Sequence, residues 1–285
     1  MTKLYRSLIF VPGNNPRFLE KAKSLPADIV CFDLEDSVPE KEKKKARNLI
    51  KKALNERKKY SPSVYARTNS PLSGKIPADL QEIVQKGIDG IVIPKVNNSK
   101  ELKKIEKAIS NLEKKRKLRP IEIMPSIESA EGVVNAYDIA SSSKRVSALV
   151  FGVFDLLDNM GIEYTKQPEG AKYARAKIPI DARAAGVLAL DAIWQDIKDE
   201  KGLKNDCKIG KELGYSGKTI IHPDQISITH KSFHPNKTEI EWAKKVCTVY
   251  LNSSKTGKGA TTVEGKMIDE VHYKRAKALL ELAKK

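Results

Sequence analysis

Short apolar runs alternate with charged, amphipathic segments along almost the whole chain, and this alternation constrains the fold most. A short apolar run suits a strand buried on both faces, and an amphipathic segment suits a helix that covers it. Such a series indicates parallel strands covered by helices. About eight units in roughly 250 residues predict a TIM (β/α)8 barrel rather than an open doubly wound sheet.

The expected strands cover residues 7–12, 28–36, 63–67, 89–95, 121–125, 148–152, the apolar end of 182–192, and 219–222. The seventh of these is the least clear, so the open sheet stays as an alternative. A dinucleotide-binding version of that sheet is disfavoured, because no G-x-G-x-x-G motif follows the first strand.

The domain organisation is expected to be a barrel over residues 1–250 and a C-terminal hinge and lid over residues 251–285. Ser, Lys and Gly dominate residues 252–259, as is typical of a hinge. Residues 264–285 are predicted to be helical. They lie outside the eight units and could close over a site.

The net charge of +17 comes from 53 basic and 36 acidic residues. Many lysines lie in residues 41–59 and 100–117, interleaved with glutamate and with few aromatics, which favours a solvated helix face over a nucleic-acid surface. An anionic cofactor such as coenzyme A is a second use for the charge.

The cellular setting is constrained by what the sequence lacks. Three widely spaced cysteines suggest neither disulfides nor a zinc site. The absence of a long apolar run or a signal-peptide pattern predicts a cytoplasmic protein without a membrane partner.

Two acids follow neighbouring expected strands, Glu128 after residues 121–125 and Asp155 after residues 148–152. The carboxyl ends of barrel strands form the active-site face, so the two carboxylates are expected to meet there. They suit Mg2+, which takes one or two carboxylates and leaves positions for substrate oxygens. Each acid could instead cap the helix that follows it.

The other strand ends add Arg67, Lys95 and a group of acids, namely Asp33, Glu35 and Asp36. Arg67 can hold a carboxylate or polarise a keto oxygen through its planar guanidinium, or form an ion pair with Glu35 or Asp36. In the first case the three acids and Lys95 would support the site from behind. His222, at the eighth strand end, is expected to be structural.

Seven motifs resemble, in order, those of the citrate lyase beta subunit (citryl-CoA/malyl-CoA lyase) family of the HpcH/HpaI aldolase superfamily. They are residues 7–13 (SLIFVPG), 32–38 (FDLEDSV), 93–96 (IPKV), 125–130 (PSIESA), 151–155 (FGVFD), 182–186 (ARAAG) and 217–223 (GKTIIHP). The resemblance covers nearly the whole chain, and Thr68-Asn69 departs from the Val-Asn more usual after the arginine.

The resemblance implies a TIM barrel with Mg2+ held by Glu128 and Asp155, and substrate contacts from Arg67 and Glu128. It also implies a homotrimer or hexamer in which a C-terminal lid covers a neighbouring subunit's site. Residues 265–269 (GKMID) resemble that segment, with Asp269 as the acid–base residue.

The implied function is Mg2+-dependent carbon–carbon cleavage of a 3-hydroxyacyl-CoA, such as citryl-CoA or malyl-CoA, to acetyl-CoA and a 2-oxo acid. An alternative is a malate or citramalate synthase-like enzyme that also hydrolyses the thioester. A non-catalytic binding protein is a third hypothesis, which a salt-sensitive nucleic-acid complex without metal-dependent turnover would support.

Overall fold

The computed structural model describes residues 5–166, 168–255 and 259–284. The chain divides after Thr229 into two compact units, Met1–Thr229 and His230–Lys285. The boundary expected at residue 250 instead lies inside a helix of the second unit. Within the described residues, no helix is both long and apolar enough to cross a membrane.

The first unit is a closed barrel of eight parallel strands in sequential order, with β1 paired to β8. The predicted (β/α)8 fold is therefore confirmed. The strands are β1 (Ser7–Pro12), β2 (Ile29–Asp33), β3 (Ser63–Arg67), β4 (Gly90–Ile93), β5 (Glu122–Ile127), β6 (Ala148–Phe151), β7 (Leu188–Asp191) and β8 (Gly217–Ile220).

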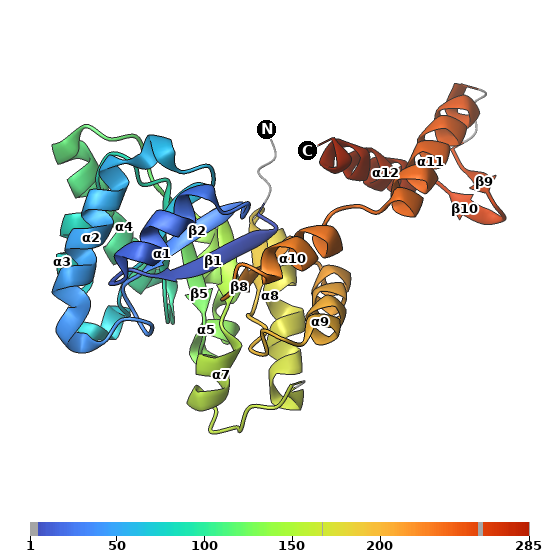
Figure 1. Cartoon of the computed structure of the whole chain (residues 1–285). Helices are drawn as coiled ribbons and strands as arrows, with labels where there is room; N and C mark the ends of the chain where they lie inside the picture. The colour runs from blue at the N-terminus through green and yellow to red at the C-terminus, as the bar shows by residue number, and fades with distance from the viewer. Residues whose placement is uncertain (1–4, 167, 256–258, 285) are drawn as a thin grey trace. The chain divides into compact units, whose positions relative to one another are not determined.

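Helices surround the strands in the barrel unit (Figure 1). Several begin where a polar side chain accepts backbone N–H groups, as Asn98 does for α4 and Ser129 for α5. The helices are α1 (Pro16–Lys21), α2 (Lys43–Asn55), α3 (Ile76–Ile83), α4 (Ser99–Arg116), α5 (Ala130–Val134), α6 (Ala136–Ser141), α7 (Val153–Asn159), α8 (Lys172–Ala184), α9 (Glu200–Leu213) and α10 (Gln225–Phe233), the last of which crosses the unit boundary.

Apolar side chains form the barrel core, including Leu8, Cys31, Met124 and Leu190. Each is buried, and burying a side chain of this size contributes roughly 1.5–3 kcal/mol. The parallel register places the last residue of β2, Asp33, beside the last residue of β3, Arg67. Polar residues at the strand ends are thus brought together above the core.

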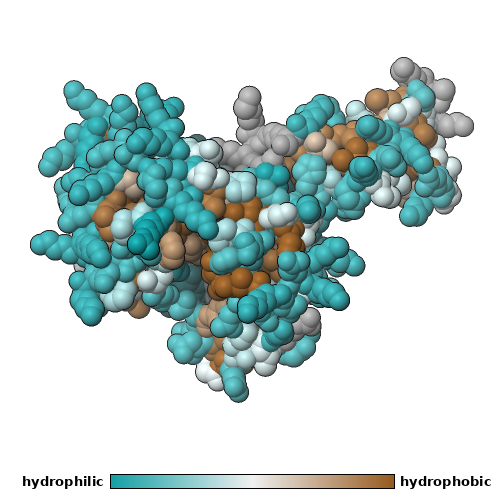
Figure 2. Space-filling model, in the orientation of Figure 1, coloured by the Kyte–Doolittle hydropathy of each residue, from teal (hydrophilic) through white to brown (hydrophobic). Residues whose placement is uncertain are grey.

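The lysine-rich helices expose hydrophilic faces, as the sequence predicts. Hydrophilic side chains predominate on the visible side around α2, with some hydrophobic atoms among them (Figure 2). Ion pairs there join Lys45 to Glu42 at 3.9 Å and Lys51 to Glu82 at 2.9 Å. Exposed pairs of this kind contribute little to stability, about 0–1 kcal/mol each.

The C-terminal unit contains α11 (Lys237–Lys255), an antiparallel hairpin of β9 (Thr261–Val263) and β10 (Lys266–Ile268), and α12 (Glu270–Ala283). Its core includes Ala243, Val246, Val263, Ile268 and Ala276.

The helix predicted from residue 264 is wrong in its first part. Glu264 and Gly265 both have positive φ, 52° and 75°, and form the two-residue loop of the hairpin. Two such residues in succession fit the turn that matches strand twist. Part of the expected hinge, residues 252–255, belongs to α11, and residues 256–258 lie outside the described residues.

Candidate active site

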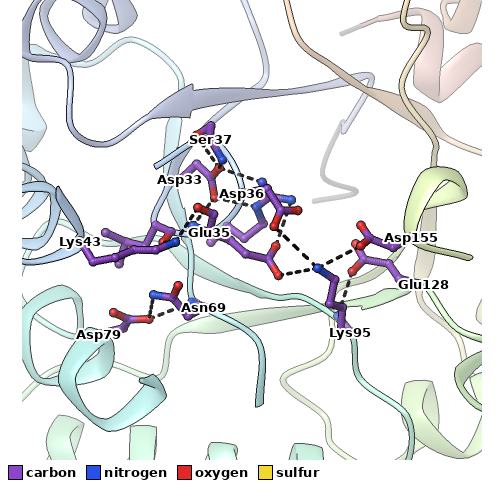
Figure 3. Close-up of polar contacts among 12 residues, drawn as sticks. Asp33, Glu35, Asp36, Ser37, Lys43, Asn69, Asp79, Lys95, Glu128 and Asp155 are labelled. Carbon is purple, nitrogen blue, oxygen red and sulfur yellow. Dashed lines mark hydrogen bonds and ion pairs between the residues drawn. The ribbon is translucent and has the colours of Figure 1, made fainter. Parts of the chain in front are cut away.

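The strand ends of the barrel bring the predicted site residues together from five consecutive strands and the segments that follow them. Asp33 and Arg67 end β2 and β3, Lys95 follows β4, Glu128 follows β5, and Asp155 lies in the first turn of α7 after β6. Figure 3 shows Lys95 between the acids after β2 on one side and Asp155 on the other.

Glu128 is buried, with 6% of its surface exposed. Its Oε2 accepts the backbone N–H of Lys95 at 3.0 Å. Gly152 leaves the space that the side chain occupies, because a Cβ at position 152 would lie 2.4 Å from Cγ of Glu128 and 2.6 Å from its Oε1. The capping alternative for Glu128 does not hold, since Ser129 caps α5.

Asp155 is about one-third exposed, and its Oδ1 lies 2.9 Å from Nζ of Lys95. It is not the N-cap of α7 either. Gly152 occupies that position and makes no side-chain capping bond. The sequence allowed Glu128 and Asp155 to be helix caps, and the structure excludes this role for both.

Arg67 is held mainly by Asp33, through two parallel hydrogen bonds of 2.7 Å from Nε and Nη2. Its Nη1 lies 3.3 Å from Glu35, and the guanidinium stacks over Phe10 with Cζ 4.4 Å from the ring centroid. The ion pair predicted with Glu35 or Asp36 therefore exists with Glu35 but is secondary to Asp33.

The Asp33–Arg67 pair is fully ionised. Burial opposes ionisation of Asp33, but the Arg67 charge and its hydrogen bonds outweigh burial and lower the pKa of Asp33 to about 2. Ser37 donates to Asp33 through both its backbone N–H and its hydroxyl. The guanidinium is thus fixed in one orientation.

Glu35 lies between the two cations of the site, with its carboxylate 3.3 Å from Arg67 and 3.2 Å from Lys95. Neither of its oxygens has a hydrogen-bond partner among the described residues. Burial raises its pKa to about 7 despite Arg67. Lys43 fixes the backbone here by donating to the carbonyls of Leu34 and Glu35.

The local charge favours a cation near Glu128. Burial, followed by the charges of Glu35 and Asp155, raises the pKa of Glu128 to about 8. Carboxylates outnumber Arg67 and Lys95 in this cluster. A divalent ion would offset the excess charge.

The donor set fits Mg2+ better than a transition metal. Within the described part of the chain, no group of three or more His, Cys, Asp or Glu is arranged to hold a metal ion. Mg2+ needs only one or two carboxylates and fills its other positions with water and substrate oxygens. Glu128 and Asp155, which line the same cavity, are two carboxylates of this kind.

The carboxylates and Arg67 line one cavity of about 440 Å³, a volume suited to a small substrate. Its apolar wall was not predicted from sequence, because Phe10, Phe151 and Ile193 look like ordinary core residues until the strands are placed. The other lining residues are Pro12, Asp33, Asp36, Ser37, Arg67, Glu128, Val150, Gly152, Val153, Phe154, Asp155, Thr219 and Ile221.

Three further residues lie away from this contact network or support it from outside. Asn69, which keeps the asparagine of the usual Val-Asn pair, is buried and donates its backbone and side-chain N–H groups to Asp79. His222 has a partly exposed side chain 3.4 Å from Asp224. Asp269 belongs to the C-terminal unit, where it caps α12 and contacts the ring of His272 at 2.7 Å, so its catalytic role stays a prediction.

The family model for HpcH/HpaI aldolase/citrate lyase matches residues 6–223, which is most of the chain. The chain belongs to this family. The predicted family and the lyase class of enzyme are therefore confirmed.

Relatives match along nearly their whole length. The citrate lyase subunit beta of Haemophilus influenzae is 34% identical, covering 99% of this chain and 98% of that protein. A (3S)-malyl-CoA thioesterase of Cereibacter sphaeroides is 33% identical, covering 98% of this chain and 94% of that protein. The mitochondrial citramalyl-CoA lyase of Rattus norvegicus is 32% identical, covering 98% of this chain and 86% of that protein.

Solved structures agree with the fold. The CitE protein of Mycobacterium tuberculosis, in complex with magnesium, acetoacetate and coenzyme A, superposes with a TM-score of 0.82 at 26% identity, covering 99% of both chains. The citrate lyase beta subunit from M. tuberculosis, complexed with oxaloacetate and magnesium, gives 0.70 at 25% identity over 81% of this chain and 98% of that one. Magnesium, the predicted cofactor, is thus present in structures of similar proteins.

Proposed function

We propose that this chain is a Mg2+-dependent lyase that cleaves a 3-hydroxyacyl-CoA, such as citryl-CoA or malyl-CoA, to acetyl-CoA and a 2-oxo acid. The observation that carries the proposal is the grouping of Glu128, Asp155 and Arg67 around one cavity. Similar proteins crystallised with magnesium, coenzyme A and oxaloacetate support it.

Glu128 and Asp155 would hold the metal. The buried Glu128 carboxyl, with its raised pKa, and the space left by Gly152 support this assignment. Bound Mg2+ would supply a Lewis acid that draws electron density from an oxygen of the substrate. The two carboxylates would also fix the position of that oxygen relative to Arg67.

The reaction breaks the carbon–carbon bond between the hydroxyl-bearing carbon and the carbon next to the thioester. A carboxylate base takes the hydroxyl proton, the hydroxyl oxygen becomes the keto oxygen of the 2-oxo acid, and the electron pair of the broken bond forms the enolate of acetyl-CoA. A proton added to that enolate carbon completes acetyl-CoA. Arg67, oriented by Asp33, would stabilise negative charge on the oxo-acid oxygens.

Asp269 is the proposed donor of the proton to the enolate. Hydrogen bonds from His272, first the ring and then the backbone, lower the pKa of Asp269. The ionised carboxylate can remove a methyl proton in the condensation direction. In the cleavage direction it must first take up a proton, such as the one released by the substrate hydroxyl, which it then gives to the enolate carbon. Asp269→Ala should therefore lose turnover and keep oxo-acid binding, and unchanged turnover would remove Asp269 from the mechanism.

Cleavage assays test the proposal directly. Acetyl-CoA release from citryl-CoA and malyl-CoA should require Mg2+, stop in EDTA, and be lost in Glu128→Ala and Asp155→Ala. Asp158→Ala is a matched control, because Asp158 is an exposed acid on the same helix. Metal-independent cleavage, or full activity in both site variants, would refute the proposal.

A second candidate is hydrolysis of the CoA thioester, which the similarity to a (3S)-malyl-CoA thioesterase favours. A thiol reagent distinguishes the two functions, because hydrolysis releases free coenzyme A from malyl-CoA whereas cleavage alone releases acetyl-CoA. The homotrimeric or hexameric state and the cytoplasmic location stay predictions. Light scattering of the purified protein tests the former, and cell fractionation the latter.

A further inference from the structure

Lys95 has an unusual backbone for its place in the fold. Among the described residues, the non-glycine residues with positive φ are Lys95 (53°), Lys117 (52°) and Glu264 (52°). Lys117 ends helix α4 and Glu264 lies in a hairpin loop, where such a conformation is common. Lys95 instead lies two residues after the end of β4, and a strained residue persists there only if its surroundings require it.

This backbone lets one residue contact both candidate metal ligands. The amide of Lys95 donates to Oε2 of Glu128 at 3.0 Å, and its ammonium lies 2.9 Å from Oδ1 of Asp155. The same ammonium is 3.2 Å from Glu35 and 3.7 Å from Asp36, which hold it from the opposite side (Figure 3). Lys95 therefore binds one carboxylate oxygen of Glu128 through its amide and one of Asp155 through its ammonium.

Lys95 contacts acids of the site without lining the cavity. The residues that line the cavity include Glu128 and Asp155, whereas Lys95 is not among them. Its contacts are with the acids, so any effect on a bound ion passes through them. Residues of this kind orient the groups that bind a metal and tune its affinity.

We propose that Lys95 is a positioning residue that leaves Glu128 and Asp155 one oxygen each to offer, and thereby makes the site selective for Mg2+ over Ca2+. The inference rests on the proposed metal site. Mg2+ requires near-ideal octahedral coordination, whereas Ca2+ takes six to eight oxygen ligands and often binds both oxygens of a carboxylate. A carboxylate that has only one oxygen available to the metal therefore disfavours Ca2+, the larger ion.

Lys95 has a second possible effect, because its positive charge repels any cation. The selectivity between Mg2+ and Ca2+ separates this charge effect from the positioning of the carboxylates. Mg2+ and Ca2+ carry the same charge, so loss of an ammonium changes both affinities by a similar factor. Loss of the side chain releases the second oxygen of Asp155, whereas the backbone bond to Glu128 remains, and this release favours Ca2+ specifically. The ratio of the two dissociation constants is thus the informative quantity.

The test is calorimetric titration of the metal-free protein with MgCl2 and with CaCl2. Wild type should bind Mg2+ more tightly, and Lys95→Gly should reduce its preference for Mg2+ by about tenfold, the lower end of effects seen for such residues. Lys117→Gly is the matched control, because it removes a lysine with the same φ outside the cluster and should leave the ratio unchanged. Glycine adopts this conformation freely, so both variants should keep their fold.

An unchanged ratio in Lys95→Gly would overturn the proposal, even if both affinities shift. If that variant does not fold, Lys95→Met provides the same comparison, and failure of both to fold would show that Lys95 is structural and overturn it as well. Absence of binding of either ion to wild type would instead refute the metal site of the proposed function.

Discussion

Replacing Glu128 by glutamine should stabilise the metal-free protein at neutral pH and abolish its response to Mg2+. Burial, followed by the charges of Glu35 and Asp155, raises the pKa of Glu128 from 4.5 to about 8. For a carboxyl group with a raised pKa, stability is greatest below pH 4.5 and is lost as the pH rises towards 8. Glutamine stays neutral and removes this cost.

The magnitude follows from the two pKa values. At pH 7 the unfolded chain has lost the proton and the folded protein has kept it. The proton uptake on folding then costs about 3 kcal/mol at pH 7 and under about 1 kcal/mol at pH 5. The variant should be more stable than wild type by about these amounts.

Urea unfolding in EDTA at pH 5 and pH 7 measures the difference, and repetition with Mg2+ should raise the midpoint of wild type only. Glu113→Gln is a matched control with the same exposed fraction, 6%. Glu113 is paired with Arg145 and accepts the N–H of Ile121, so its loss should destabilise the protein. A Glu128→Gln protein no more stable than wild type at pH 7, or an advantage that does not shrink at pH 5, would refute the reasoning.

Further substitutions test other contacts of the site. Gly152→Ala should weaken Mg2+ binding at least tenfold in calorimetry, because its Cβ would lie 2.4 Å from Cγ of Glu128, whereas Gly259→Ala at an open position should not. Arg67→Lys should reduce kcat/KM by about 100-fold, because an ammonium cannot make both parallel bonds to Asp33; wild-type kinetics would contradict this role. The pKa of Asp33 is lowered from 3.8 to about 2 in the folded protein. Its ionised form therefore adds about 2 kcal/mol to the free energy of unfolding above pH 4, and this contribution is lost as the pH falls to 2. Asp33→Asn should therefore show a smaller fall in unfolding free energy over that range, and an equal fall would exclude the effect.

The barrel could be predicted because its strands are buried on both faces and read as short apolar runs. The acids at their ends could be predicted for the same reason, since a carboxylate directly after such a run must lie at the rim. Glu128 follows this rule, and Asp155 follows β6 within the first turn of α7. Their contacts could not be predicted, because they depend on side chains from the segment after β4 and the loop after β2.

Lys95 illustrates that limit. The motif Ile93-Pro-Lys-Val96 places a lysine after a strand but does not reveal positive φ or the reach of its ammonium to Asp155. The hairpin at Glu264-Gly265 is different, because a glycine between alternating segments was a usable signal. The helix expected over residues 264–285 overlooked this signal.

The position of a bound metal tests the central claim most directly. Crystals grown with Mn2+ in place of Mg2+ would locate the ion by its anomalous scattering. We expect one strong peak within bonding distance of a carboxylate oxygen of Glu128 and one of Asp155, in the cavity that Arg67 lines. A peak bound to other acids, or none at this pair in a protein that turns over, would contradict the account.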